Sequence, residues 1–547
     1  MSNSGEASAK KRPPAPRPGT VQSIARSMRS WRTASVALLS FASGLPLGLV
    51  TIAIPDWMRS IGLDIRLVGL MTLAQAPWTF KILWSPLMDR YAPPGWGRRR
   101  GWAGLAQIAL AISTFALAGV GSQPEAPWIV AALALAIAFS SATQDIAIDA
   151  YAVDVLREDE QGVAIGARIA VYRIAMQLAG AWAITLAGWV SWPTVNVMLA
   201  CLYIPMLLVT WKAPEPEEVH PAPRTLRDAV WLPFVGFLSR HRSLEILAFV
   251  LTYKLSDNLA TALVRPFLHD MGYDAFHRGF AMGTIGVVCT LVGTFLGGSM
   301  TTALGLGHCL WIFGVLQALA SLGYVMLAGT GVNLPLMYSA TAFESLVIGM
   351  GTGAFSVLLV RLTQKRFSAT QYALFSSLFG LPRLFSGPIA GFTASAFGWR
   401  TFFWWTIAAG IPGLIILSRF VPLGVRDPVF EVEPPRAGPR LTRAQIVRRG
   451  IMGGAFATLS GALALAFLSA LTKMRDPSGG GFDLVAELKA LVQPVGVAGW
   501  TGLVGVVVFG LLCGLLSAAV SVARQGEPES EQENDRPAEP AASRNAR

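Results

Sequence analysis

Long apolar runs separated by short polar stretches dominate the hydrophobicity pattern of this 547-residue chain. A run of about 20 apolar residues can cross the roughly 30 Å hydrocarbon core of a bilayer as one α-helix. The pattern predicts fourteen spanning helices, near residues 33–53, 66–88, 102–120, 127–156, 162–190, 193–211, 244–268, 279–300, 306–328, 334–361, 369–396, 400–421, 450–472 and 496–523. We therefore expect an all-α membrane protein.

The composition supports this class. Hydrophobic residues make up 53 % of the chain and charged residues 14 %, whereas soluble domains carry about 25 % charged residues. Residues 1–32 are polar and basic and lack the apolar core of a cleavable signal peptide, so we expect the first span to direct insertion.

Basic residues are concentrated in alternate loops. They are frequent before span 1 and between spans 2 and 3, 6 and 7, 10 and 11, and 12 and 13, but absent between spans 3 and 4, 5 and 6, and 9 and 10. Because Lys and Arg collect on the cytoplasmic side of membrane proteins, both termini are predicted to be cytoplasmic. The net charge of +12 then needs no nucleic-acid partner.

An internal repeat appears when the chain is shifted by 210 residues. The matched positions are Gly62, Asp64 and Gly69 with Gly272, Asp274 and Gly279, Gln161 with Gln371, Arg173 with Arg383, and Gly188-Trp189 with Gly398-Trp399. Such a repeat predicts two six-helix halves related in parallel, as in major facilitator transporters.

The predicted organisation follows from the repeat and the loops. The regions are a basic cytoplasmic tail (1–32), an N-terminal half (33–211), a cytoplasmic linker (212–243), a C-terminal half (244–421), a cytoplasmic loop (422–449), two additional spans (450–523) and a disordered cytoplasmic tail (524–547).

Carboxylates inside the spans are candidates for proton coupling, because an intramembrane charge costs at least ~2.5 kcal/mol and usually faces a cavity or a partner. Asp145 and Asp149 lie four residues apart and share one helix face. The candidates are Asp145, Asp149, Asp257 and Glu344.

Cationic and amide side chains in the spans are candidates for substrate binding. Arg173 and Arg383 are equivalent in the repeat, and a guanidinium from each half suits a substrate with several carboxylates. The candidates are Arg173, Arg383, Lys254, Gln75, Gln144 and Gln177. Structural alternatives stay open: Lys254 and Asp257 can neutralise each other, and Asp145 or Asp149 can pair with Arg168 or Arg173. Lys81 is long enough to extend to the bilayer interface.

Other chemistry is not indicated. The sequence contains no catalytic constellation, no His pair at metal-ligand spacing and no nucleotide-binding loop, so we expect no enzyme, no metal and no cofactor, with a proton gradient as the energy source. The glycine-rich GMGTGAF segment (349–355) lies inside a span and indicates close helix packing.

Several blocks resemble the AmpG muropeptide permease family, a branch of the major facilitator superfamily. They are SGLPLGL (43–49), FKILWSPLMDRYAPPGWGRRRGW (80–102), SATQDIAIDAYAVDVL (141–156), YKLSDNLA (253–260), FES...GMGTGAF (343–355) and FSATQYALFS (367–376). The resemblance covers about residues 33–421, and the two additional helices also suit this family. Within the blocks, Tyr151 stands where the family pattern has Trp, and TIAIPDWM at the end of span 1 departs from it, which suggests altered substrate preference.

The resemblance implies a function and a gate. It implies proton-coupled import of GlcNAc-1,6-anhydroMurNAc peptides across the bacterial inner membrane for peptidoglycan recycling, which feeds signals for β-lactamase induction. We expect a monomer in the lipid bilayer. The stretch LMDRYAPPGWGRRR is similar to the superfamily's motif between spans 2 and 3. By that likeness Asp89, Arg90 and Arg98, Arg99 and Arg100 form a cytoplasmic gate that closes the outward-facing state.

Alternatives remain from the sequence. The same fold suits another anionic cargo such as acetyl-CoA, or a drug exported in exchange for protons. A membrane scaffold or sensor without transport is the remotest alternative.

Overall fold

The computed structural model describes residues 27, 29–62, 74, 76–93, 95–122, 127–216, 223, 225–430, 441–475, 481–494 and 496–523. All regular elements in these residues are helices. The predicted tail 524–547 and nearly all of the tail 1–32 lie outside them.

The N-terminal half begins with the first predicted span and ends before the linker. Its elements are α2 (Trp31–Gly48), η1 (Leu49–Ala53), α3 (Ile54–Ser60), α5 (Ala76–Phe80), η3 (Lys81–Leu83), α6 (Ser85–Arg90), α7 (Arg98–Ala118), α8 (Pro127–Val155), α9 (Glu158–Gln177), η4 (Leu178–Trp182), α10 (Ala183–Ala187), α11 (Trp192–Cys201) and α12 (Tyr203–Lys212).

The C-terminal half follows the linker helix α13 (Leu226–Leu238). Its elements are α14 (Ser243–Thr252), α15 (Leu255–Asp270), α16 (Ala275–Gly279), η5 (Phe280–Ile285), α17 (Gly286–Leu304), α18 (Leu306–Ala320), α19 (Leu322–Thr330), α20 (Leu334–Leu362), η6 (Lys365–Phe367) and α21 (Ser368–Phe420). Beyond it lie α22 (Arg443–Arg475), α23 (Leu484–Val492) and α24 (Gly496–Ala523).

Eleven helical stretches among the described residues are long and apolar enough to cross a membrane. Three of the fourteen predicted spans are not among them. Span 2 falls partly outside the described residues, span 7 is interrupted between α14 and α15, and the residues of span 11 form the first part of α21. The helix α21 continues into span 12 through a turn at Gly398, where φ is 78°. The number fourteen therefore stays a prediction.

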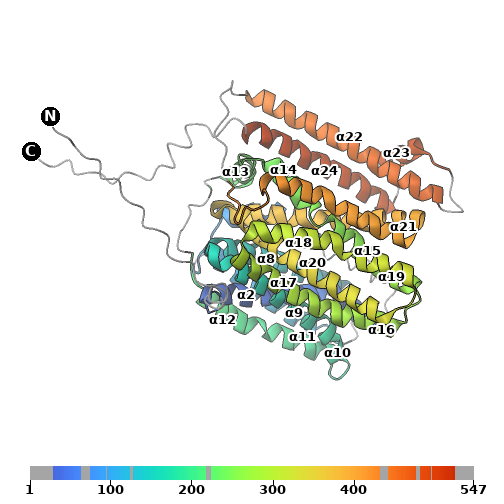
Figure 1. Ribbon diagram of the computed structural model, residues 1–547. Helices are drawn as coiled ribbons and strands as arrows, with labels where there is room; N and C mark the ends of the chain where they lie inside the picture. The colour runs from blue at the N-terminus through green and yellow to red at the C-terminus, as the bar shows by residue number, and fades with distance from the viewer. Residues whose placement is uncertain are drawn as a thin grey trace, which may run out of the picture.

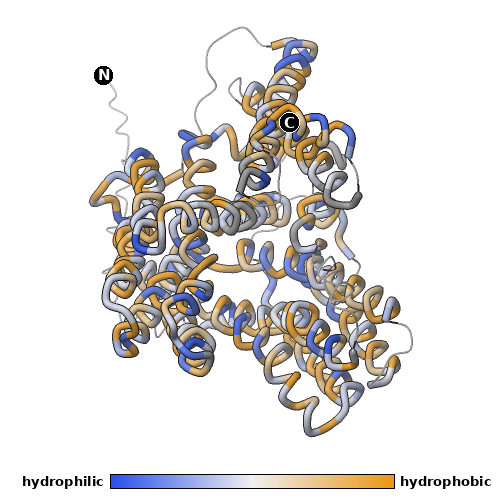
Figure 2. Tube along the Cα trace, turned by 90° about the vertical axis from the view of Figure 1, so that its right-hand side faces the viewer, coloured by the Kyte–Doolittle hydropathy of each residue, from blue (hydrophilic) through white to orange (hydrophobic). Residues whose placement is uncertain are grey.

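The spanning helices run side by side along one direction, and α22 and α24 form a layer along one edge (Figure 1). The end of the bundle near α12 and α13, on the left in Figure 1, carries the arginines that begin α7, and we call it the arginine-rich end. The other end, near α16 and α19, is called the opposite end. Hydrophobic residues occur on helices all round the outside of the bundle (Figure 2), and many are exposed there, including Leu83, Phe115, Trp128 and Ile204. This distribution suits a surface covered by lipid.

The turn before the second span recurs in both halves. Gly62 and Gly272, which the 210-residue shift equates, both have a φ of 86°. A positive φ favours glycine because it has no Cβ. The equivalent pair Gly188 and Gly398 does not share a conformation, since only Gly398 has a positive φ. The common turn nevertheless supports the predicted repeat.

Among the described residues, buried hydrophobic clusters join the halves at the arginine-rich end only. At the arginine-rich end a single cluster combines N-half residues such as Leu39 and Ile146 with C-half residues such as Phe355 and Phe375. At the opposite end one cluster contains N-half residues alone and another contains C-half residues alone. The halves are therefore closed on each other at the arginine-rich end and have separate cores at the opposite end.

Glycines bring α9 and α17 into close contact across the halves. A Cβ placed on Gly298 would lie 2.5 Å from the carbonyl oxygen of Gly162 and 2.7 Å from Cα of Gly166. Gly353 packs as closely within the C-terminal half. A Cβ placed on it would lie 2.5 Å from the carbonyl oxygen of Thr294. The prediction that the GMGTGAF segment serves close helix packing is confirmed.

The linker contains a helix that contacts both halves. Thr225 and Asp228 cap α13 reciprocally, and the helix packs against α6, α21 and the additional helix α24. Gln371 of α21 donates its side-chain N–H to the Pro233 carbonyl at 2.8 Å. The hydroxyl of Ser239 lies 3.5 Å from the Ala523 carbonyl of α24. The helix α13 is thus an ordered part of the arginine-rich end.

The loop after α21 is fixed to the same end by Asp427. Its carboxylate accepts hydrogen bonds from Arg361 at 2.7 Å and from the Leu306 amide at 3.2 Å. Burial raises the pKa of Asp427, but these two hydrogen bonds and the positive charges of Arg361 and Arg426 together outweigh burial and leave the pKa below its ordinary value.

We predict that Gly298→Val separates α9 from α17 and weakens closure at the arginine-rich end. The added side chain has no room beside Gly162, so the helices must move apart. The inter-helix distance is measured by spin labels placed on the two helices at this end. The control is Gly329→Ala, where a Cβ meets nothing within 4 Å. An unchanged distance distribution for Gly298→Val contradicts the prediction.

Candidate functional site

A network of charges closes the arginine-rich end, and Asp89 is at its centre. Asp89 is completely buried (0 % exposed) at the end of α6 in the N-terminal half. Its carboxylate accepts hydrogen bonds from Arg99 Nη2 at 2.6 Å and from the amide and hydroxyl of Thr370 at 2.8 and 2.6 Å. The Ala369 amide is 3.3 Å away. Asp89 therefore caps the first turn of α21, a helix of the other half, where unpaired amides favour a negative charge.

Arg99, which lies in α7, extends this network to a fourth helix. It is 4 % exposed, and its Nε donates to Asp154 of α8 at 2.9 Å. Its Nη2 also donates to the Ser368 hydroxyl at 2.7 Å. We call the set Asp89, Arg99, Asp154, Ser368 and Thr370 the closed gate, because it ties α6, α7 and α8 to α21.

The other predicted gate residues have different contacts. Arg98 donates to the backbone carbonyl of Asp89 at 3.2 Å, and Arg100 donates to the Ala213 carbonyl at 2.8 Å and pairs with Glu215. Arg90 lies over the ring of Tyr91, 5.3 Å from its centre. Sequence reasoning missed Ser368 and Thr370 as gate residues, although the Ser-Ala-Thr at the start of span 11 is a helix-start signal.

A cluster of buried charges lies in the N-terminal half next to the closed gate. Asp149 of α8 pairs with Arg168 of α9 and, at 3.4 Å, with Lys81 of η3. All three side chains are at least 85 % buried. Lys81 thus does not extend to the interface, while the alternative pairing of Asp149 with Arg168 is confirmed. The guanidinium of Arg168 also lies 5.8 Å from the ring centre of Tyr372 in α21, so the cluster touches the other half.

Asp145 is bound differently from Asp149. It accepts a hydrogen bond from the Ser43 hydroxyl of α2, and Lys81 and Arg168 are near enough to interact with it electrostatically. Along α8 the carboxylates of Asp145, Asp149 and Asp154 follow one another over about 13 Å of helix, at 1.5 Å per residue. They lead from the interior of the bundle to the closed gate.

The C-terminal half contains a second buried ion pair. Lys254 lies at the break between α14 and α15 and donates to Asp257 and to Gln317 Oε1, both at 2.6 Å. It also donates to the Ile348 carbonyl at 3.1 Å. Lys254 is 3 % and Asp257 6 % exposed. Mutual neutralisation, which the sequence left open, is the arrangement that the structure has.

Glu344 lies in α20 beside a tyrosine. The Tyr324 hydroxyl donates to its Oε2 at 2.5 Å, and Oε1 has no hydrogen-bond partner among the described residues. Glu344 is 6 % exposed and packs between α19 and α20 within the C-terminal half.

The remaining substrate-binding candidates are placed only in part. Gln144 is completely buried, and its amide group has no hydrogen-bond partner in the part of the chain that the structure describes. Arg173 and Gln177 are partly exposed on α9. Gln75 and the side chain of Arg383 lie outside the described residues.

Tyr151, which stands where the resemblance expects Trp, is part of the closed end. Its hydroxyl is 3.3 Å from Ser35 Oγ and donates to the Pro214 carbonyl at 2.9 Å. Its side chain is 1 % exposed. Tyr151 therefore bonds to the linker, and the altered substrate preference stays a prediction.

Comparisons with known proteins agree with this architecture. Residues 36–387 match the family model of the Major Facilitator Superfamily. The anhydromuropeptide permease of Escherichia coli K12 is 42 % identical over 388 residues, which are 71 % of this chain and 79 % of the relative. The chain belongs to the anhydromuropeptide permease family of the Major Facilitator Superfamily.

Two further comparisons concern a second sequence relative and the fold. An uncharacterised protein of Haemophilus influenzae is 33 % identical and shares 71 % of this chain and 94 % of its own length. The crystal structure of the Escherichia coli fucose:proton symporter has the same fold, with a TM-score of 0.56, 12 % identity, and coverage of 72 % of this chain and 99 % of that one. The predicted fold class and the AmpG resemblance are confirmed, and the protein belongs with membrane transporters, not enzymes.

We predict that Asp89→Asn opens the closed gate. The amide cannot balance the charge of Arg99 or accept every hydrogen bond that the carboxylate accepts. In a cysteine-free background, a cysteine at Ala369, which is 1 % exposed, should react slowly with a membrane-impermeant thiol reagent, and roughly tenfold faster when Asp89 is replaced.

The control for this experiment is Arg90→Gln, which changes a charge next to Asp89 at a side chain that lies over Tyr91. If Arg90→Gln accelerates labelling as much as Asp89→Asn, local charge and not the gate contact controls access.

We predict that Asp149→Asn destabilises the protein more than Asp145→Asn. Asp149→Asn leaves Lys81 and Arg168 buried without their carboxylate, a change that costs about 3–5 kcal/mol for buried pairs. An amide at position 145 can still accept the Ser43 hydrogen bond, so its cost should be about 1 kcal/mol. Thermal unfolding in detergent, followed by tryptophan fluorescence, measures both. Equal losses would show that the ion pairs of Asp149 contribute no extra stability.

Proposed function

We propose that this protein is a proton-coupled importer of anhydromuropeptides, GlcNAc-1,6-anhydroMurNAc peptides, for peptidoglycan recycling. The proposed substrate is based on the 42 % identity to the E. coli protein named anhydromuropeptide permease. The joint core at the arginine-rich end, with separate cores at the opposite end, supports transport by alternating access.

The arginine-rich end is the cytoplasmic end in this proposal, because basic residues collect on the cytoplasmic side. Both termini are then cytoplasmic, and the membrane is the bacterial inner membrane. The conformation is outward-facing: substrate enters between the halves at the opposite end, and the closed gate prevents its passage into the cytoplasm.

Proton binding at the buried cluster gives a mechanism for coupling. While Asp149 is ionised, it occupies both Lys81 and Arg168. A proton on Asp149 removes its charge and leaves these two cations to be neutralised by a carboxylate of the substrate. Proton and anionic substrate then bind together and move in the same direction, which defines symport.

Release of the substrate requires the gate to open. Arg168 touches Tyr372 of α21, two residues after Thr370. A substrate carboxylate that draws Arg168 away from Asp149 changes this contact with the helix that Asp89 caps. The cycle requires no cofactor, and a monomer contains all of these groups.

The other carboxylates rank below Asp149 in this mechanism. Asp145 is the second member of the same cluster and shares its cations electrostatically. Asp257 already pairs with Lys254 inside the C-terminal half, and Glu344 contacts Tyr324 on the side of α20 that faces α19.

Uptake of labelled GlcNAc-anhydroMurNAc-tripeptide tests the proposal. Cells that lack their own permease and express this chain should accumulate the label, and a protonophore should abolish accumulation. Asp149→Asn should reduce proton-driven uptake roughly tenfold or more, because the titrating group is lost. Asp159→Asn, at an exposed position that begins α9, should leave uptake unchanged.

Other outcomes identify the alternatives. In one such outcome, correctly inserted protein imports no anhydromuropeptide but transports acetyl-CoA or exports a drug in a substrate panel. That result would assign a different substrate to the same fold. Absence of transport for every compound in the panel would leave the scaffold or sensor alternative.

A further inference from the structure

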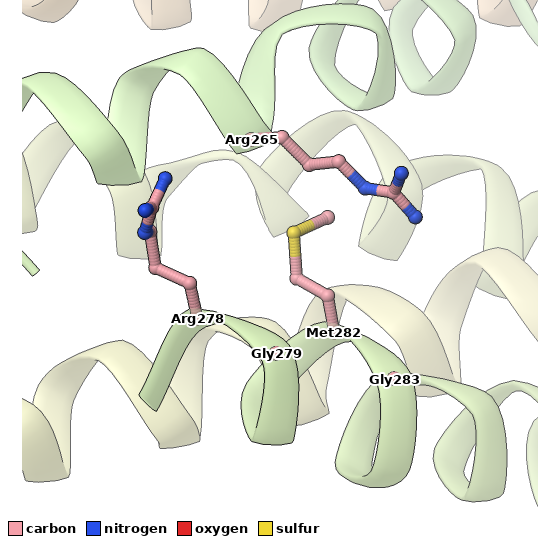
Figure 3. A pocket seen from close by; sticks show the side chains of 5 residues that line it. All are labelled: Arg265, Arg278, Gly279, Met282 and Gly283. Atoms are coloured by element: carbon pink, nitrogen blue, oxygen red, sulfur yellow. The ribbon is translucent and has the colours of Figure 1, made fainter. Parts of the chain in front are cut away.

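Two arginines flank a cavity at the opposite end of the C-terminal half. The cavity has a volume of about 260 Å³, and its lining residues are Arg265, Arg278, Gly279, Met282 and Gly283. Arg265 extends from α15 and Arg278 from α16, one on either side of Met282 (Figure 3). The lining contains two basic residues and no acidic residue.

No carboxylate in the described part of the chain pairs with either arginine. The two nearby acids have other partners: Asp270 lies 3.4 Å from His269 Nδ1, and Asp274 accepts the His277 amide at 3.2 Å. Arg278 uses only its Nε, which is 3.4 Å from the Asp274 carbonyl, and so keeps its two terminal amino groups. The guanidinium groups are therefore available to an anion from outside the protein.

Arg265 and Arg278 lie at the end of the bundle where several loops lack basic residues. The loops at the opposite end between spans 3 and 4, 5 and 6, and 9 and 10 carry no basic residue. The positive-inside bias that accounts for the arginine-rich end does not account for arginines here.

The loop that carries Arg278 is held in place. Gly272 provides a turn with a φ of 86°, and Asp274 caps α16. Tyr273 is 4 % exposed, and its hydroxyl accepts the Asn333 amide at 2.8 Å and donates to the Asn333 carbonyl at 3.1 Å. These contacts fix α16 to the beginning of α20. Arg278 is thus presented from a constrained backbone.

The cavity also has room for a ligand group. A Cβ added to Gly279 or Gly283 would meet nothing within 4 Å. The volume of about 260 Å³ is below the roughly 300–1,000 Å³ of pockets that enclose a whole small ligand. It suits one acidic group of a larger molecule, since guanidinium groups match the planar carboxylate with paired hydrogen bonds.

We propose that Arg265 and Arg278 form a capture site for a peptide carboxylate of the substrate at the entrance of the transporter. This inference rests on the proposed function, since it assigns the site to the same anionic substrate. Both arginines are at least partly exposed. Binding at this site is therefore weak and transient, and it raises the local concentration of substrate before the substrate reaches the buried cluster.

Uptake kinetics of the tripeptide substrate test the capture site. The double substitution Arg265→Gln/Arg278→Gln should raise KM about five- to tenfold, as expected for the loss of two exposed charge contacts, with Vmax within about twofold. The same substrate with its peptide carboxyl groups amidated should have the same KM for the double variant and the unaltered protein. Raising the ionic strength should increase KM for the unaltered protein and much less for the variant.

The matched control is Arg400→Gln. It removes an exposed charge from the C-terminal half that does not line the cavity, and KM should stay unchanged. If the double variant behaves as Arg400→Gln does, or if amidated and free substrates are affected equally, the capture site is refuted and the proposed import stands. If the unaltered protein, correctly inserted, imports no anhydromuropeptide, the proposed function fails and the capture site fails with it.

Discussion

The buried carboxylate of Asp89 is the interaction on which the closed end of this protein depends. It is fully removed from solvent, and an isolated charge in such a place is prohibitively expensive. Arg99 and the first turn of α21 compensate it, and they come from both halves. The two halves must therefore meet at this point for the charge to be stable. The close approach of Gly162, Gly166 and Gly298 is what allows the backbones to come near enough.

The same requirement explains two of the three carboxylates in the last part of the fourth span. Asp154 pairs with Arg99 in the gate, and Asp149 pairs with Lys81 and Arg168 one and a half turns earlier. These ion pairs are buried, unlike surface salt bridges, which contribute little to the free energy of folding. Each ion pair offsets the cost of burying a charge in a low-dielectric interior. The free energy of each pair therefore changes strongly when its carboxylate binds a proton or its cation binds an anion. Groups that stabilise one conformation in this way are also able to respond to a ligand.

Hydrophobic periodicity was sufficient to predict the helical class and most helix bounds. Loop charge predicted the orientation of the termini, and the 210-residue repeat predicted two halves, because both can be found in the sequence without knowledge of tertiary contacts. The loop arginines also indicated a gate at Asp89. The partners could not be predicted, since Asp89 and Thr370 are 281 residues apart and meet only through tertiary packing.

The charged candidate residues also show that sequence spacing predicts local pairs and does not predict distant ones. The i, i+3 spacing was enough to suggest Lys254 with Asp257, and this pair is present. Lys81 is 68 residues from Asp149 in the sequence, so spacing could not predict their pairing. The length of the Lys81 side chain was the only basis for a prediction, and it wrongly suggested that Lys81 reaches the bilayer interface. Arg265 and Arg278, which pair with no carboxylate among the described residues, had no sequence signal except their location on the side with few basic residues.

The ordered helix in the linker alters how motion between the halves must be pictured. A connection of about thirty residues between two domains that move relative to each other is usually regarded as a flexible linker. Here α13 is bonded to α21 through Gln371, packs on α6 and lies against the end of α24. It behaves as a pivot with fixed points of attachment, so the halves cannot rotate without either carrying this helix along or breaking those contacts. The two spans beyond the repeat are thereby part of the mechanical frame of the transporter.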